Sequence, residues 1–129
     1  MLEILLDSVI LIDHFNDNEK ATHFISSLDP NNTAISVTTR AEILVGFDEV
    51  EEIEKVKSLL DQFTLLIIDK GIADKAAEFR RTFGWKLPDA FQAALAVEHK
   101  LRLATRNTKD FNPKQHAFVE IPYRLTGSR

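Results

Sequence analysis

Five side chains in this sequence have the types and the placement that metal-assisted hydrolysis requires. They are Asp7, Glu42 and Asp89, followed by the pair Asn107 and Asp110. Each of them follows an apolar run or opens a stretch with helical spacing, so we expect them near the ends of strands. Acids gathered at one edge of a sheet repel one another unless a cation neutralises them. Oxygen donors of this kind suit Mg²⁺, which can activate water for attack on a phosphodiester.

Each acid, taken alone, also has a structural interpretation. Asp7 suits the position that ends a strand before a helix. Glu42 follows Thr39 by three residues, which is the spacing of a capping box. Asp89 follows Pro88 at the start of an apolar helix, where a carboxylate interacts favourably with free N–H groups. Only the combination of the three acids favours a metal site.

The composition of the chain limits the other possibilities. The 129 residues contain no cysteine, which excludes disulfides and thiolate-bound zinc and is typical of a cytoplasmic protein. The four histidines show no metal-ligand spacing, and the sequence has no glycine-rich nucleotide loop or G-x-S-x-G motif. The formal net charge of -4 argues against a broad basic surface for nucleic acid, unless bound cations hold the phosphate.

Apolar runs with strand-like and helix-like spacing alternate along the chain. The predicted strands span residues 3–6, 33–37, 65–68, 102–105 and 118–121, and the predicted helices span 9–15, 18–28, 38–45, 50–63, 72–83 and 90–97. We expect Ser8 to cap the first helix. The alternation favours one α/β domain, residues 1–129, with a mostly parallel sheet between two layers of helices. The ligand site of such a sheet lies beyond the carboxyl ends of the strands, where the strand order reverses.

Four blocks of sequence follow one another in a familiar order. They are Leu5–Ser8 with Leu11–Asp13, then Ser36–Ile43, Leu87–Ala90 and Ala104–Phe111. In this order and at this spacing they resemble the PIN-domain family, and within it the VapC-type toxins. The resemblance implies a three-layer α/β/α fold with a five-stranded parallel sheet. It also implies a Mg²⁺- or Mn²⁺-dependent endoribonuclease that serves as the toxin of a toxin–antitoxin pair.

The resemblance also implies roles for individual residues. Asp7, Glu42 and Asp89 match the three most regular acids of the family, which hold the metal ion. The fourth acidic position of the family falls at Asn107 here, so we expect Asp110 to be the auxiliary acid. The residues expected to position the RNA substrate are Ser8, Arg40, Thr105, Arg106 and Asn107, and the candidates for contact with the RNA backbone are Lys100, Arg102, Arg106 and Lys109.

Family likeness further implies a homodimer and an antitoxin whose tail wraps the toxin and can direct an arginine toward the acidic site. We expect no membrane segment, because the apolar amino-terminal stretch is short and interrupted by acids. One departure from the family pattern is Val9, where members usually carry a hydrogen-bonding side chain two residues after the first acid. Together with Asn107, Val9 leaves open a catalytically degenerate PIN fold that only binds RNA or a protein.

Two other classes of protein are disfavoured by the end of the first strand. A receiver-like module would use Asp69 as phosphoacceptor, but it needs an acidic pair where this chain has Asp7 followed by Ser8. A phosphatase with an aspartate nucleophile needs Asp-x-Asp at the same place. Val9 interrupts that motif.

Overall fold

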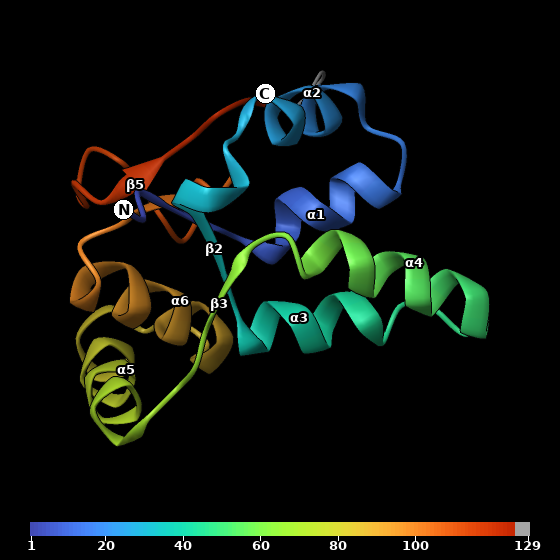
Figure 1. Ribbon diagram of the computed structural model, residues 1–129. Coiled ribbons are helices and arrows are strands. Elements are labelled where there is room, and N and C mark those ends of the chain that lie inside the picture. The colour runs from blue at the N-terminus through green and yellow to red at the C-terminus, as the bar shows by residue number, and fades with distance from the viewer. Residues whose placement is uncertain (126–129) are drawn as a thin grey trace.

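A computed structural model describes residues 1–125, and a five-stranded sheet lies at its centre (Figure 1). The strands are β1 (Ile4–Leu6), β2 (Thr33–Ser36), β3 (Thr64–Leu66), β4 (Arg102–Ala104) and β5 (Val119–Glu120). All neighbouring strands run parallel, in the order β3-β2-β1-β4-β5. The predicted fold class is therefore confirmed, whereas the expected domain end at residue 129 lies outside the described residues.

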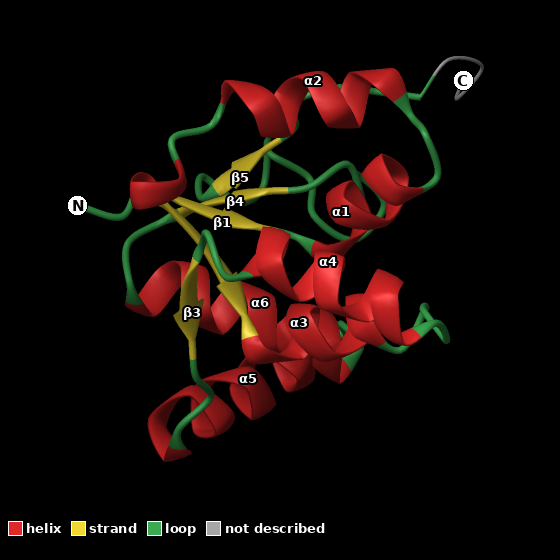
Figure 2. Cartoon of the chain, turned by 45° about the vertical axis from the view of Figure 1, so that its right-hand side comes forward, coloured by secondary structure: helices red, strands yellow, loops and turns green. Residues whose placement is uncertain are grey.

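Helices cover both faces of the sheet (Figure 2). They are α1 (Ser8–Phe15), α2 (Glu19–Ser27), the short 3₁₀ helix η1 (Pro30–Asn32), α3 (Val37–Leu44), α4 (Val50–Leu60), α5 (Lys70–Phe83) and α6 (Leu87–Glu98). Helices α1 to α4 share one buried apolar cluster with the sheet, and α5 and α6 share the other. None of the helices within residues 1–125 is both long enough and apolar enough to cross a membrane.

Strand β1 serves both clusters because successive side chains of a strand point to opposite faces. Leu5 packs in the cluster beneath α5 and α6, while Ile4 and Leu6 pack in the cluster beneath α1 to α4. All three side chains are buried. A strand covered on both faces is apolar throughout, which explains the continuous run Ile-Leu-Leu.

Strand β1 also lies where the strand order reverses. It pairs with β2 on one side and with β4 on the other. Asp7 follows β1 directly and Thr105 follows β4 directly, so both residues stand at the carboxyl edge of the two strands that flank the reversal. This edge is the location that the sequence predicts for a ligand site.

Two of the predicted helix caps are wrong. The N-cap of α1 is Asp7 rather than Ser8, because Asp7 Oδ1 accepts a hydrogen bond from the Ser8 N–H at 2.9 Å. Helix α3 is capped by Ser36, whose Oγ accepts a hydrogen bond from the Thr39 N–H at 3.0 Å. Glu42 therefore takes no part in a capping box, and its exposed side chain interacts with Ser8 instead.

The third strand ends earlier than predicted. Strand β3 pairs Leu65 with Ile35 and Leu66 with Ser36. Strand β2 ends at Ser36 because that residue caps α3. Ile67 has no ladder partner beyond this point, so it leaves the sheet and is 67% exposed.

The Asp69 carboxylate has a structural role that disfavours the phosphoacceptor interpretation further. Its Oδ1 accepts a hydrogen bond from the Ile72 N–H at 2.9 Å and so caps α5. Helix α5 then runs to Phe83 and ends at Gly84, whose φ of 74° lies in the left-handed region that favours glycine.

Candidate active site

The Asp7 carboxylate is buried and firmly oriented. Its side chain is only 5% exposed. Besides the Ser8 N–H, Gln92 Nε2 donates to Asp7 Oδ1 at 3.1 Å. Thr105 Oγ1 donates to Asp7 Oδ2 at 2.7 Å across the β1–β4 boundary. Burial raises the pKa of Asp7, and the hydrogen bonds offset only part of that rise.

Gln92 is a member of this site that the sequence pattern does not predict. It lies in an otherwise apolar stretch of α6 and is 3% exposed. Its Nε2 also donates to Thr39 Oγ1 at 3.2 Å, while its buried Oε1 has no hydrogen-bond partner within residues 1–125. A lone amide among apolar residues of a buried helix is a usable signal, because buried polar groups need partners. Gln92 and Thr105 supply the orientation that Val9 cannot give to Asp7.

Asp89 and Glu42 experience the negative charge of the same cluster. Asp89 is half-buried in the first turn of α6. Burial, together with the charge on Asp7, Asp110 and Glu42, raises its pKa to about 6. Burial and the charge of Asp7 likewise raise the pKa of Glu42. These interactions place the four expected acids together at the carboxyl edge of the sheet.

Asn107 and Asp110 lie in the turn that follows β4 and are joined to each other. Asn107 Nδ2 donates to Asp110 Oδ2 at 2.9 Å, and the Asp110 N–H donates to Asn107 Oδ1 at 3.3 Å. Thr105 Oγ1 accepts a hydrogen bond from the Asn107 N–H at 3.1 Å. Asn107 therefore orients the carboxylate of Asp110, and Thr105 links this turn to the site of Asp7.

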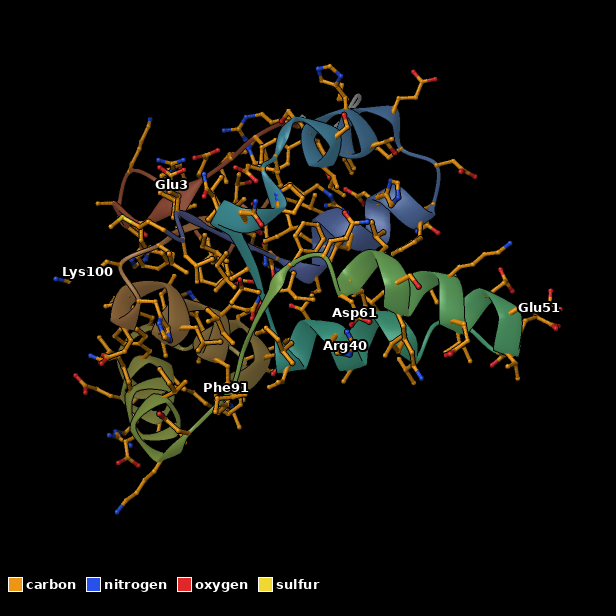
Figure 3. The ribbon with its side chains drawn as sticks, in the orientation of Figure 1. Glu3, Arg40, Glu51, Asp61, Phe91 and Lys100 are labelled. Atoms are coloured by element: carbon orange, nitrogen blue, oxygen red, sulfur yellow. The ribbon has the colours of Figure 1, made fainter. Side chains whose placement is uncertain are left out.

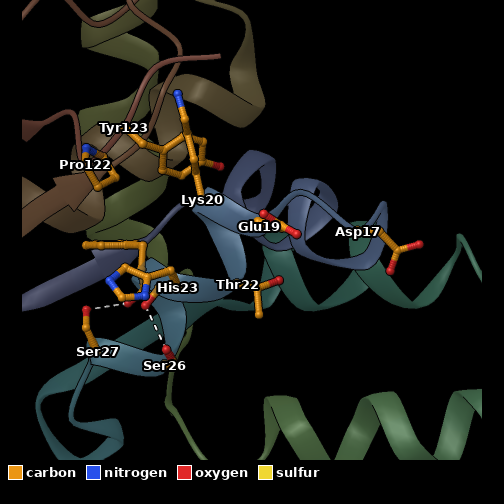
Figure 4. A pocket seen from close by; sticks show the side chains of 10 residues that line it. Asp17, Glu19, Lys20, Thr22, His23, Ser26, Ser27, Pro122 and Tyr123 are labelled. Atoms are coloured by element: carbon orange, nitrogen blue, oxygen red, sulfur yellow. Dashed lines mark hydrogen bonds between the residues drawn. The ribbon is translucent and has the colours of Figure 1, made fainter. Parts of the chain in front are cut away.

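A cavity of about 580 Å³ lies against the acids. The carboxylates Asp7 and Asp89 line it together with the cations of Arg106 and Lys109. A larger cleft of about 940 Å³ lies between α2 and residues 122–123 (Figure 4). None of the expected site residues lines that cleft. We therefore take the smaller cavity, which contains both acids and cations, as the candidate active site.

Arg106 is held on the wall of this cavity by side chains from two other segments. Its Nε and Nη2 donate to the two carboxylate oxygens of Asp13 in α1. The Tyr123 hydroxyl donates to Asp13 Oδ2 at 2.7 Å. Burial raises the pKa of Asp13, but the hydrogen bonds from Arg106 and Tyr123 outweigh it, so the net shift is downward. Arg106 thus has a fixed place before any substrate arrives.

The residues expected to position substrate fall into two groups. Those that line the cavity are Ser8, Arg106 and Asn107. Thr105 is fully buried, holds Asp7 and does not line the cavity, so its expected role in positioning substrate stays a prediction. Arg40 turns toward α4, where its Nη1 lies 2.9 Å from Asp61 Oδ1 (Figure 3). Arg40 does not line the cavity, and its expected role in positioning substrate stays a prediction.

Lys100 and Arg102 are separated from the acids by the length of a strand. Lys100 precedes β4 and Arg102 begins it, whereas the acids stand at the carboxyl edge. Arg102 forms an ion pair with Glu120, with 2.6 Å between Nε and Oε1. Of the four cations expected near RNA, only Arg106 and Lys109 line the cavity.

The donor chemistry of the site fits a divalent cation held by oxygen atoms. Asp7, Glu42 and Asp89 supply carboxylates whose mutual repulsion a cation would relieve. The unpartnered Gln92 Oε1 is a further buried oxygen beside Asp7. Within residues 1–125, no three acidic or histidine side chains already lie close enough together to hold an ion. Binding therefore requires the carboxylates to turn toward the ion.

Comparison with known proteins places the chain in a family. The profile of the PIN domain matches residues 4–114. The chain belongs to the PIN-domain family. The match includes all four acids of the site, and it confirms the family that the sequence blocks predict. The Tyr123 contact to Asp13 lies beyond the matched part of this PIN domain.

Solved structures share the PIN fold with this chain. A chain of a toxin–antitoxin complex from Klebsiella pneumoniae is 34% identical, with a TM-score of 0.87 over 95% of this chain and 100% of that one. A chain of FitAcB from Neisseria gonorrhoeae is 27% identical, with a TM-score of 0.76 over 95% of this chain and 99% of that one. The comparison with curated proteins gave no match.

Proposed function

We propose that this PIN-domain protein is a Mg²⁺- or Mn²⁺-dependent endoribonuclease, the VapC-type toxin of a toxin–antitoxin pair, which acts in the cytoplasm. The observation that carries the proposal is the gathering of four acids from separate segments at one edge of the sheet: Asp7, Glu42, Asp89 and Asp110. Carboxylates that raise one another's pKa destabilise the fold, and such clusters are typical of functional sites.

In this proposal Asp7, Glu42 and Asp89 hold the ion. When bound, a divalent cation lowers the pKa of water and offsets the charge that develops on phosphate. Thr105 and Gln92 fix the direction of Asp7 through their hydrogen bonds to its two oxygens. Because both donors are buried, Asp7 keeps its direction while the more exposed Glu42 adjusts to the ion.

The remaining residues of the site act on the RNA strand. Asp110 is the auxiliary acid, and Asn107 keeps its carboxylate aimed by two hydrogen bonds. Arg106 and Lys109 bind the phosphate next to the acids, and Ser8 adds a hydroxyl to the same wall. A fixed guanidinium suits this role because it loses little freedom when it binds an anion.

A protein partner is part of the proposal. The 34% identical chain from Klebsiella pneumoniae belongs to a toxin–antitoxin complex, and this likeness supports an antitoxin that binds the present chain. The cluster of four acids at the edge of the sheet suits an antitoxin tail that carries an arginine, since opposite charges attract across an interface. Family likeness also supports a homodimer.

Cleavage of a labelled RNA mixture tests the proposal. The assay compares wild-type protein with Mn²⁺ or Mg²⁺, wild-type protein with EDTA, and the variants Asp7→Asn and Asp89→Asn. Asp74→Asn is the matched control, because Asp74 is an exposed acid on α5. We expect cleavage by the wild type and the control, and a loss of at least about a hundredfold in the two site variants and in EDTA.

One alternative remains specific enough to test in the same assay. If the wild type binds RNA or an antitoxin but cleaves no more RNA than Asp7→Asn does, the chain is a degenerate PIN fold that only binds. The three donors that hold Asp7 argue against this alternative, because they keep a catalytic carboxylate in place.

A further inference from the structure

Phe83 presents an exposed aromatic ring next to the candidate active site. It is the last residue of α5, and it is 47% exposed. One face of its ring stacks on Trp85, with ring centroids 4.6 Å apart and an interplanar angle of 29°. His116 meets it edge to face, with centroids 5.0 Å apart. Phe79 also meets the ring edge to face, with centroids 5.9 Å apart, and the part of the ring that these neighbours leave uncovered faces solvent. We call Phe83, Trp85 and His116 the aromatic platform.

The platform is rigid because its base is buried. Gly84 ends α5 in the left-handed conformation and reverses the chain, so that Trp85 turns back into the core and is 5% exposed. The indole packs edge to face on Phe79, with centroids 6.0 Å apart, and against Phe111 at 5.0 Å. Because Trp85 is fixed, the Phe83 ring stacked on it loses little conformational entropy when it stacks on a ligand.

Hydrogen bonds join the platform to the acids. Trp85 Nε1 donates to the carbonyl oxygen of Asp110 at 2.8 Å. Arg80 Nη1 donates to the carbonyl oxygen of Trp85 at 2.7 Å. The next residue along the chain is Lys86, whose positive charge acts on Asp89. The platform is thus hydrogen-bonded to Asp110, and the residue that follows Trp85 interacts with Asp89.

Exposed cations neighbour the platform in the sequence although the whole chain is acidic. Exposed cations flank its members in the sequence, at Arg81, Lys86 and Lys114, and Lys109 lines the neighbouring cavity. The formal net charge of the chain is -4. An open aromatic face beside cations matches a single nucleic-acid strand, which presents unpaired bases for stacking and phosphates for ion pairing. An apolar protein surface would match the ring but not the cations.

We propose that the aromatic platform stacks on an unpaired base of the RNA strand whose phosphate enters the candidate active site. This proposal rests on the proposed function and adds a base-binding site to it. Stacking on Phe83 requires a base that is turned out of a duplex, so the platform favours single-stranded loops over paired RNA. Trp85 is hydrogen-bonded to the carbonyl oxygen of Asp110. The position of the stacked base therefore also sets which phosphate reaches the acids.

Binding of a fluorescent strand tests the platform. The probe is a short single-stranded oligoribonucleotide with one 2-aminopurine base, whose emission falls when the base stacks. It is titrated with the full chain in Ca²⁺, which binds oxygen ligands and can hold phosphate at the acids, and quenching is read before any cleavage accumulates. The variants are Phe83→Ala, Phe83→Leu and Phe83→Trp. Val97→Ala is the control for loss of an exposed apolar side chain on the neighbouring helix, since Val97 is 38% exposed on α6.

We expect Phe83→Ala and Phe83→Leu to bind the probe about tenfold more weakly than the wild type and to lose its quenching. Phe83→Trp and Val97→Ala should bind as the wild type does. Equal binding and quenching by Phe83→Ala would overturn the platform and leave the nuclease proposal standing. A wild type that does not bind the probe would overturn the platform, whereas the cleavage assay decides the nuclease proposal separately. Full affinity of Phe83→Leu for the probe would assign Phe83 to a protein contact instead. A Phe83 variant that sediments as a monomer where the wild type is a dimer would lead to the same assignment.

Discussion

The amide of Gln92 connects two parts of the site at the scale of single atoms. Its Nε2 donates to Asp7 and to Thr39, and its buried Oε1 has no partner within residues 1–125. A buried polar atom without a hydrogen bond destabilises a protein by about 1–3 kcal/mol. An apolar residue would fill the same space without that penalty, so the amide serves the orientation of Asp7 rather than packing.

We expect Gln92→Leu to separate stability from ion binding. Leucine removes the unpartnered oxygen, so the melting temperature in EDTA should stay the same or rise. The same change frees Asp7, so Mn²⁺ affinity measured by calorimetry should fall about tenfold. Gln62→Leu, an exposed site in the turn after α4, is the control and should change neither quantity. Unchanged Mn²⁺ affinity in Gln92→Leu would show that the amide has no role in orienting Asp7.

The stability of the metal-free protein should depend on Asp89 and on pH. Burial and three neighbouring carboxylates raise the pKa of Asp89 to about 6 in the folded state, so its ionised form is disfavoured there. Stability is therefore lost as the pH rises through about 6. Asp89→Asn lacks this loss. Solvent screens part of the charge at this half-buried site. We therefore expect the free energy of unfolding of Asp89→Asn at about pH 7 to exceed that of the wild type by about 1 kcal/mol.

Denaturant unfolding in EDTA at about pH 7 and about pH 4 measures this difference. The variant and the wild type should converge at the lower pH, where Asp89 is protonated in the folded protein. A variant that is no more stable than the wild type at about pH 7 would contradict the repulsion inferred among the four acids.

At the scale of elements, Asp13 ties three segments together. It lies in α1, Arg106 follows β4, and Tyr123 follows β5. The Asp13 side chain is only 10% exposed and that of Arg106 is 28% exposed. The hydrogen bonds among these side chains therefore fix the loop after β4, which carries Thr105 and Asn107, against the helix that Asp7 caps.

We expect Asp13→Asn to destabilise the protein by about 2 kcal/mol at neutral pH, because Arg106 loses its charged partner. Arg106 and Tyr123 lower the pKa of Asp13. Its contribution is therefore present above the ordinary carboxyl pKa and is lost as the pH falls below it. Thermal melts across this range measure the effect, with Asp74→Asn as control. A constant difference between Asp13→Asn and wild type at all pH values would contradict an ionic role for Asp13.

The local sequence pattern could predict the helices and strands and the acids Asp7, Glu42 and Asp89. It could not predict the contacts between helices and strands. Asp7 and Asp89 were predictable because each joins an apolar run to a helix. Gln92 stands 85 residues from Asp7, and no local spacing connects them. The cap of α3 was mispredicted because Ser36 and Thr39 both have suitable hydroxyls, and only the end of β2 decides between them.

The cations show the same limit of local reasoning. Arg106 and Lys109 line the cavity because they follow β4. Arg40 does not line it and pairs instead with Asp61, which follows α4. Side-chain direction on a helix depends on such tertiary partners, which the sequence spacing does not contain.

At the scale of the whole molecule, the winding of the chain brings the acids to one place. The chain passes from β1 outward to β3 and returns across the sheet to β4, which leaves the carboxyl ends of β1 and β4 side by side. The starts of α1 and α6 and the turn after β4 supply Asp7, Asp89 and Asp110, and α3 supplies Glu42. We propose that Asp7, Glu42 and Asp89 hold a divalent cation at this edge, with Asp110 as the auxiliary acid beside them.

Calorimetric titration of the metal-free protein with Mn²⁺ tests this claim most directly. The samples are the wild type, Asp89→Asn, and Asp74→Asn as the matched control. We predict binding to the wild type and to Asp74→Asn, and an affinity at least about tenfold lower for Asp89→Asn. Equal affinity in all three proteins, or no binding to the wild type, would contradict the claim that the gathered acids form a metal site.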